Sequence, residues 1–373
     1  MPRRADLVVG AVGLWRAPGP EDSVHRTPVF GLLAKLDAIR KWCVSRSFMQ
    51  AWQVRKHGEP RDALQLGELA EPTPGPGMLR VRVAASGLGL PDLLMCRGSY
   101  ALTPPLPFTP GQELVGVVSE AGEGAQTRVG ERVMAVSGFM LGHGGCAQQA
   151  LALDEFALPV PESMTDAEAA GFLIPYHTAY VGLVRRAGLR AGETLLVLGG
   201  AGGSGSAALQ LGRALGARVL ATAGGSEKVE FCRRLGAEGV IDYRTQDIAE
   251  RVREATQGRG ADVIYDPVGG EAFTAATQCI AHEGRLLAVG FASGDWARPS
   301  TAHLVTHNYS LMGVMPGGYD REFKRAAHEI LLEYQRKGEI GVPLHRIVPF
   351  IALPEGLEDL AQGRVMGKAV LAV

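Results

Sequence analysis

The sequence has no two cysteines in C-x-x-C spacing, and its five cysteines are scattered over 373 residues. This distribution argues against a disulfide framework and favours a reducing, cytoplasmic setting. No apolar run reaches the roughly 18 residues of a membrane-spanning helix, so no membrane partner is expected. Lys and Arg number 38 against 39 Asp and Glu, which gives a net charge of −1. That balance provides no electrostatic reason to expect nucleic acid as a partner.

The strongest motif present lies within residues 195–219. Residues 195–198 predict a short buried strand, and a glycine-rich turn and an amphipathic helix follow it. Gly200, Gly202 and Gly205 satisfy G-x-G-x-x-G in this strand-to-helix context. The first glycine allows the tight turn, the second lets a pyrophosphate approach the backbone, and the third lets the helix pack against the strand. The motif predicts a dinucleotide site that includes Gly203 and Ser204; a turn that binds nothing is the alternative.

The end of the next strand indicates which dinucleotide is bound. It falls at Gly224, about 20 residues after Gly205, where an NAD-specific domain places an acidic residue on the ribose. No carboxylate stands at that position, and Ser226, Lys228 and Tyr243 are close to it in sequence. Small residues, hydrogen-bond donors and a cation suit a 2′-phosphate. The sequence therefore predicts NADPH rather than NADH.

Two patterns of secondary structure follow one another along the chain, whose length already suits two domains. Short strands with Pro and Gly turns between them predict a small antiparallel barrel, with strands at 79–84, 114–120 and 132–136. The later pattern alternates helices with strands and predicts a doubly wound parallel sheet. Its helices are expected at 168–184, 229–235 and 248–256, and its strands at 263–266 and 286–291.

We therefore expect a first domain at 49–173, completed by the tail at 313–373, and a Rossmann domain at 174–312. Residues 1–48 differ from the rest, with eight Lys and Arg against four Asp and Glu and one predicted helix at 30–44. They are interpreted as a disordered extension or as residues upstream of a natural start at Met49. An Arg-rich transit peptide is the alternative.

Residues 49–373 carry, in one register, the phrases AASGLGLPDLLMCRGSY, PFTPGQELVGVV, GERVMAV, GGAGGSGSAALQLGRALGARV, DPVGG and GKAVLAV. This series resembles the medium-chain dehydrogenase/reductase superfamily and, within it, the zinc-free quinone oxidoreductase family. The resemblance implies an α/β protein, with a Rossmann doubly wound parallel sheet plus a GroES-like antiparallel β-barrel domain.

The positions where zinc alcohol dehydrogenases hold catalytic zinc correspond here to Gly89, Gln112 and Ile174. Catalytic zinc needs three N, S or O ligands, so the resemblance implies a zinc-independent protein. The four-cysteine structural zinc lobe is also missing. His143 and Cys146 are two ligands at most, and a loop histidine and a packed thiol are the simpler interpretation.

Without a Lewis acid, the expected chemistry is hydride delivery to an electron-poor acceptor such as a quinone or an α,β-unsaturated carbonyl. Tyr100 matches the catalytic tyrosine of the related enoyl-thioester reductases and is the candidate proton donor; lining the cleft without acting as an acid is the alternative. Gly89, Asp92, Gln112 and Tyr176 are expected on the substrate side. A helix N-cap is an equal explanation for Asp92.

The resemblance also implies further cofactor contacts. Thr178 is expected near the nicotinamide, and Gly290 and Phe291 are expected to bring backbone amides to the carboxamide. Lys368 is expected near the cofactor cleft, with a solvated strand-end lysine as the alternative. His177 is expected to have a surface or supporting role.

Three functions stay open: an NADPH:quinone oxidoreductase, a 2-enoyl or 2-enone reductase, and a noncatalytic NADPH-binding protein of the crystallin or RNA-binding kind. The variable loops at 138–145 and 292–300 are expected to select the acceptor. The apolar stretch 310–315 predicts a strand at the edge of the Rossmann sheet, where pairing across a two-fold axis would form a homodimer. An internal strand is the alternative there.

Overall fold

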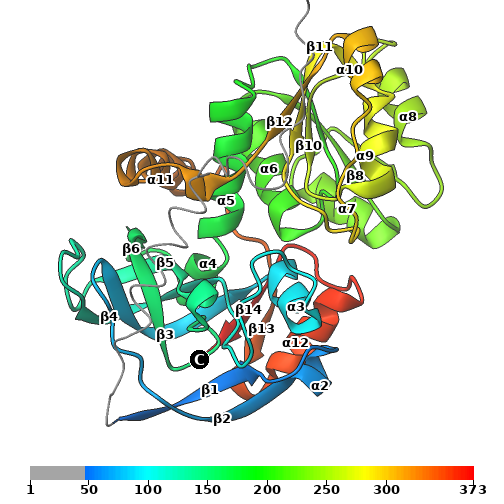
Figure 1. The fold of residues 1–373 in the computed structure, drawn as a ribbon. Helices are drawn as coiled ribbons and strands as arrows, with labels where there is room; N and C mark the ends of the chain where they lie inside the picture. Colours follow the sequence, from blue (N-terminus) through cyan, green and yellow to red (C-terminus); the bar gives the residue numbers. More distant parts are fainter. Residues whose placement is uncertain (1–46) are drawn as a thin grey trace, which may run out of the picture. The chain divides into compact units, whose positions relative to one another are not determined.

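The computed structural model describes residues 47–373. The predicted extension 1–48 and its helix at 30–44 lie outside the described residues, apart from the last two positions. The expected first strand is present as β1 (Phe48–Val54), which pairs antiparallel with β2 (Leu64–Ala70). Two six-stranded sheets follow, one in each part of Figure 1.

The glycine-rich turn belongs to a parallel sheet of order β12-β11-β10-β7-β8-β9. Its strands are β7 (Thr194–Val197), β8 (Arg218–Ala223), β9 (Gly239–Asp242), β10 (Ala261–Asp266), β11 (Ile280–Ala288) and β12 (Ser310–Gly313). Chain order reverses at β7, and open α/β sheets bind ligands at the carboxyl ends of the strands beside such a switch point. The glycine motif found in the sequence therefore follows β7, at the end of the sheet where a ligand is expected.

Helices cover both faces of this sheet (Figure 1). Leu195 and Val197 pack in one buried cluster with residues of α5 and α6, and Leu196 packs in another with residues of α8 and α9. This alternation follows from the period-two geometry of a strand. The helices of this part are α5 (Leu173–Tyr180), α6 (Gly203–Ala214), α7 (Ser226–Arg234), α8 (Ile248–Ala255), α9 (Gly270–Thr277) and α10 (Thr301–His307).

One predicted helix is interrupted in the structure, and one predicted strand is shorter than expected. The single helix expected at 168–184 is three pieces, α4 (Asp166–Ala170), α5 and a π-helix, η2 (Val181–Arg186). Gly171 ends α4, and Pro175, which has no N–H to give to a preceding turn, is tolerated only because α5 begins anew at Leu173. The strand expected at 286–291 ends at Ala288, because the amides of Val289 and Gly290 both turn to the Asp266 carbonyl.

The second sheet has the order β13-β14-β3-β4-β5-β6, and an additional pairing of β3 with β6 closes it into a barrel. All its pairs are antiparallel except β13–β14. The tail of the chain therefore returns to the barrel as two strands, the last beside β3. The strands are β3 (Met78–Leu88), β4 (Glu113–Ala121), β5 (Arg132–Ser137), β6 (Gln149–Pro159), β13 (Leu344–Pro349) and β14 (Lys368–Ala372).

Short helices connect the barrel strands, and one long helix, α11, follows β12 along the chain. They are α2 (Pro60–Ala63), α3 (Leu90–Arg97), α11 (Arg321–Arg336) and α12 (Leu353–Ala361), with 3-10 turns η1 (Phe139–Leu141), η3 (Pro316–Gly318) and η4 (Phe350–Ala352). The predicted α/β fold, a doubly wound parallel sheet plus a β-barrel, is confirmed. In residues 47–373 no helix has the length and apolar character needed to cross a membrane.

Candidate functional site

In the glycine-rich turn, the backbone lies very close to other residues of the turn and to β8. A Cβ atom at Gly205 would lie 2.2 Å from the Gly199 carbonyl oxygen, and one at Gly200 would lie 2.8 Å from Ala221 Cβ. At Gly202 the nearest atom would be 3.5 Å away, so the backbone there is open to a ligand. The packing and approach roles predicted for Gly205 and Gly202 agree with this geometry. The left-handed residue of the turn is Gly199 (φ 60°), whereas the sequence analysis assigned the tight turn to Gly200.

The N-terminus of α6 follows this turn directly. Gly202 is its N-cap, and no side chain of the described residues caps the helix. The first-turn amides of Gly203, Ser204 and Gly205 therefore point toward the carboxyl end of the sheet, where the helix dipole favours an anion. The Ser204 hydroxyl is 2.8 Å from the Tyr265 hydroxyl, which holds the first turn of α6 against β10.

A cavity of about 530 Å³ lies where β8 ends. Glycines 224 and 225, Ser226, Glu227, Lys228, Arg244, His345, Asp359, Gly363, Arg364 and Met366 line it. It thus contains three of the four residues that the sequence predicted around a 2′-phosphate, and adds cations that the sequence analysis missed. The fourth, Tyr243, is half exposed, and its hydroxyl is 2.5 Å from the Cβ position of Gly224.

The cations of this cavity differ in their partners. Lys228 Nζ donates to the Gly363 carbonyl at 2.6 Å, and Arg364 is paired with Asp359 at 2.5 Å. The Arg244 guanidinium lies 3.1 Å from the Cβ positions of both glycines, 224 and 225, and forms none of the ion pairs among residues 47–373, although its charge adds to the backbone hydrogen bonds in lowering the pKa of the Asp242 carboxyl. Arg244 is therefore the best-placed free cation. The sequence feature that could have identified Arg244 is its position directly after Tyr243, at the end of the next strand.

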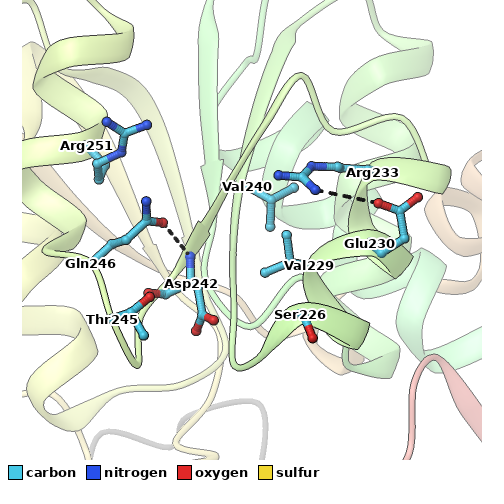
Figure 2. Close-up of a pocket in the computed structure, with 9 residues that line it drawn as sticks. All are labelled: Ser226, Val229, Glu230, Arg233, Val240, Asp242, Thr245, Gln246 and Arg251. Carbon is cyan, nitrogen blue, oxygen red and sulfur yellow. Dashed lines mark hydrogen bonds and ion pairs between the residues drawn. The ribbon is translucent and has the colours of Figure 1, made fainter.

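A second cavity, also of about 530 Å³, lies on the other side of α7 at the edge strand β9 (Figure 2). There Arg233 is paired with Glu230 on the same helix at 3.5 Å, and the Asp242 amide donates to the Gln246 side chain. None of the residues predicted for the cofactor lines this cavity except Ser226. Arg251 is paired with Glu254, and the Asp242 carboxylate accepts the amides of Gly225 and Arg244, so we do not consider this cavity a candidate for the reaction.

On the barrel side, Tyr100 and Gln112 form the candidate substrate contacts. Burial raises the pKa of the Tyr100 phenol, and the neighbouring Gln112 side chain offsets part of that rise. Gln112 is 8% exposed, and its Nε2 has no hydrogen-bond partner among the described residues. A buried amide donor without a protein partner can donate to a bound ligand, which makes Gln112 a candidate substrate contact.

The three positions that correspond to zinc ligands are described fully. Gly89 is the N-cap of α3, Gln112 precedes β4, and Ile174 is the second residue of α5. Only the Gln112 amide offers a side-chain donor atom, so this set does not fit catalytic zinc. Within 47–373 no cluster of three or more His, Cys, Asp or Glu side chains could hold a metal ion.

Asp92 is held by backbone amides. Its carboxylate accepts from Gly89 at 2.9 Å, from Gly111 at 2.9 Å and from Gln112 at 3.2 Å, and the residue is 1% exposed. Burial raises the pKa of this carboxyl to about 6 against the lowering effect of those bonds. Asp92 is the third residue of α3, not its N-cap, and it positions the turn that carries Gln112. The expected substrate contact is corrected to a supporting role.

Tyr176 and Thr178 lie inside the protein. The Tyr176 hydroxyl donates to the Gly341 carbonyl at 2.5 Å and accepts from Gln210 at 3.0 Å, and the residue is 1% exposed. The expectation that Tyr176 touches substrate is wrong, because its polar atom is used within the core. The Thr178 hydroxyl donates to the Ile174 carbonyl at 2.6 Å, one turn back in α5, which leaves its oxygen as an acceptor and its methyl group for the nicotinamide.

Lys368 is neither solvated nor free. Its Nζ forms a buried ion pair with Glu113 at 2.5 Å and donates to the Leu88 carbonyl at 3.1 Å. The aliphatic part of the side chain lies beneath the cofactor turn, since a Cβ atom at Gly203 would be 2.9 Å from Lys368 Cδ. Lys368 is thus near the cofactor site as predicted, but its charge is directed away from it.

The loop after β11 shows a similar partial agreement. Gly290 donates its amide to the Asp266 carbonyl at 3.3 Å, so of the expected pair only the Phe291 amide is left for a carboxamide. The Phe291 ring stacks on Trp296 with 4.3 Å between ring centroids. The sequence analysis did not single out Trp296, which is 57% exposed.

Comparison with known proteins adds an independent result. The family model "Alcohol dehydrogenase GroES-like domain" matches residues 75–162, and the model "Zinc-binding dehydrogenase" matches residues 203–332. A quinone oxidoreductase-like protein 2 homolog of Nematostella vectensis is 33% identical and covers 89% of this chain and 91% of its own. A mycobacterial protein complexed with NADPH has a TM-score of 0.80 at 29% identity, over 87% of this chain and all of its own. An NAD-dependent alcohol dehydrogenase has a TM-score of 0.77 at 28% identity, with the same two coverages.

Proposed function

Because the chain belongs to the quinone oxidoreductase family of the medium-chain dehydrogenase/reductase superfamily, we propose that it transfers a hydride from NADPH to a quinone or another electron-poor carbonyl without zinc. The relatives support the more general statement that the protein is an oxidoreductase with a nicotinamide cofactor and a small-molecule substrate. The acceptor class and the choice of NADPH are the proposal.

The proposal that the cofactor is NADPH rests on the cavity at the end of β8. It begins at the glycine where an acidic residue would bind the NADH ribose, and it contains Lys228 and Arg244 instead. The adjoining turn fits a pyrophosphate, because Gly202 is open and the first amides of α6 have no side-chain cap. When bound, the reduced nicotinamide supplies the hydride. The residues of this chain bind the phosphates of the cofactor and fix how far its nicotinamide reaches into the site.

The barrel side then has to stabilise the negative charge that develops on the acceptor oxygen. Gln112 Nε2 and the Tyr100 hydroxyl are the donors that the described residues place together there. A neutral phenol with a raised pKa keeps its proton at neutral pH and can donate it. This pair favours reduction of a conjugated carbonyl, so a 2-enoyl or 2-enone reductase is the second candidate.

We expect the purified protein to contain no stoichiometric zinc, although one matching family model is named for zinc binding. Gly89 and Ile174 offer no ligand atom in their side chains, so Gln112 would be left alone. Elemental analysis after mild dialysis measures this. One zinc ion retained per chain would contradict the zinc-free proposal.

A turnover screen with NADPH and NADH against quinones and enones tests the function. NADPH oxidation that depends on a quinone supports the first candidate, and saturable reduction of the enone double bond with no quinone activity favours the second. Tight NADPH binding without reduction of either quinones or enones would favour the third possibility, a noncatalytic NADPH-binding protein. Turnover that proceeds best with NADH would contradict the cofactor proposal.

A further inference from the structure

The Glu113–Lys368 ion pair is almost completely removed from water, with side chains 4% and 8% exposed. Burying two charges costs several kcal/mol per ion, which only a close pair with further hydrogen bonds recovers. Here Lys368 also donates to the Leu88 carbonyl, and the second Glu113 oxygen accepts the Ile174 amide at 2.9 Å. Two of the three N–H groups of Lys368 and both carboxylate oxygens of Glu113 thus have partners, and apolar side chains would serve stability as well.

The segments that this pair connects all border the candidate site. Leu88 precedes Gly89, Glu113 follows Gln112, and Ile174 is the second residue of α5. On the other side, the Lys368 stem supports Gly203, and the neighbouring Gly367 amide donates to the Ala201 carbonyl at 2.8 Å. One ion pair therefore connects the chain segments beside Gly89 and Gln112 and the start of α5 with the glycine-rich turn.

We propose that Glu113 and Lys368 are positioning residues, which fix the cofactor turn at a set distance from Gln112 and Tyr100. This inference rests on the proposed function, since it concerns how a bound nicotinamide meets an acceptor. Neither charge faces the cofactor phosphates, because both are used within the pair. Hydride transfer needs the reacting atoms about 3 to 3.5 Å apart, and a displacement of about 1 Å can cost a hundredfold in rate.

Three variants test the proposal: Glu113→Gln, Lys368→Met and the double variant. Each single change leaves one buried group unsatisfied, whereas the double variant leaves no buried charge and is expected to fold. We expect kcat at saturating NADPH to fall by about tenfold to a hundredfold in all three, with the double no worse than the worse single. The primary isotope effect with deuterated NADPH should rise, while NADPH affinity stays nearly unchanged. The fluorescence anisotropy of bound NADPH should fall, because the nicotinamide is held less firmly.

The matched control is the exposed pair on α11, Glu333→Gln with Lys337→Met, whose members are both 55% exposed. It should change none of these quantities. The proposal is overturned if Lys368→Met alone weakens NADPH binding tenfold, because the lysine would then act on the cofactor directly. It is also overturned if the variants lower only the thermal midpoint and leave kcat, isotope effect and anisotropy as in wild type. If wild type reduces no acceptor, the proposed function fails, and affinity and anisotropy still decide the positioning role.

Discussion

Arg244 and Lys228 supply the positive charge near Gly224, and the two are not equally available. Lys228 must leave the Gly363 carbonyl before it can meet a phosphate, whereas Arg244 has no ion-pair partner within residues 47–373. A charge-assisted hydrogen bond contributes about 1.5 to 3 kcal/mol, or roughly one to two decades in affinity. Arg244→Ala should therefore weaken NADPH binding by that amount and leave NADH binding nearly unchanged. Lys228→Ala should do the same to a smaller extent.

Fluorescence titration of both cofactors measures these effects. Arg233→Ala is the control, since that arginine lies on the other side of α7 and pairs with Glu230 (Figure 2). Equal losses for NADPH and NADH in Arg244→Ala would mean that the arginine only shapes the turn. A wild-type preference for NADH would contradict the assignment of the whole cavity.

Tyr100 is the residue that distinguishes the two candidate acceptors. Tyr100→Phe keeps the ring that packs against the barrel core and removes only the hydroxyl. General acid catalysis typically contributes a factor of about 10² to 10⁴. We expect a loss of at least about 10² in kcat for an enone, whose enolate must be protonated, and a smaller loss for a quinone, whose reduced oxygen is a weaker base. Steady-state assays with both acceptors measure this, with Tyr334→Phe on α11 as control. An unchanged enone rate would mean that Tyr100 lines the cleft without donating a proton.

At the scale of elements, two buried histidines join α5 to α11. His177 Nε2 is 3.2 Å from His328 Nδ1, and His328 Nε2 is 2.9 Å from the Pro159 carbonyl. A carbonyl only accepts, so His328 carries its proton on Nε2 and His177 donates to it. Burial is the main reason that the pKa of His177 is lowered to about 3 from 6.5, and the neighbouring His328 and Lys324 lower it further.

This shift has a definite sign for stability. Between pH 6.5 and about 3 the unfolded chain protonates His177 and the folded chain does not, so unfolding takes up a proton. The free energy of unfolding should therefore fall as the pH drops below 6.5, by up to about 1.4 kcal/mol per pH unit. His177→Gln keeps a donor toward His328 and should reduce this slope, whereas His307→Gln on exposed α10 should not. Urea denaturation between pH 5 and 7.5 measures it, and an unchanged slope in His177→Gln would contradict the assignment.

Elements were predictable where the sequence carries a local signal. The strand, glycine turn and helix around Gly202 were placed within one or two residues, because the motif and the change of periodicity are both local. The break at Gly171 and the π-helix after Tyr180 were missed. There the apolar residues continue at helical spacing, and only Gly171 and Pro175 mark the break. Packing of α5 against α6 and α11, rather than propensity, decides the bounds.

For the whole molecule, the sequence predicted both sheets and the return of the tail, and we propose the division into 49–173 with 313–373 and 174–312 on that basis. The glycine turn and its neighbour Lys228 were found because their chemistry is contiguous in sequence. The partner of Lys368 was not, because Glu113 is 255 positions away and the pairing depends on β14 and β4 lying on either side of β3 in the barrel. Tyr176 was misassigned for the same reason: its burial depends on Gln210 and Gly341, which nothing near it in sequence reveals.

The last prediction concerns assembly. β12 is the edge strand of the Rossmann sheet, as the sequence predicted, and Met315 just beyond it is 57% exposed. An edge strand presents unpaired backbone groups that invite another strand, and pairing across a two-fold axis would cover the β12 edge of both chains. We therefore expect a homodimer with twice the 39.5 kDa mass of one chain. Met315→Lys should weaken it, because two like charges would meet near the axis, whereas Ile351→Lys, at a site 74% exposed on the barrel side, should not. Light scattering at micromolar concentration measures the mass, and a clean monomer for wild type would contradict the dimer.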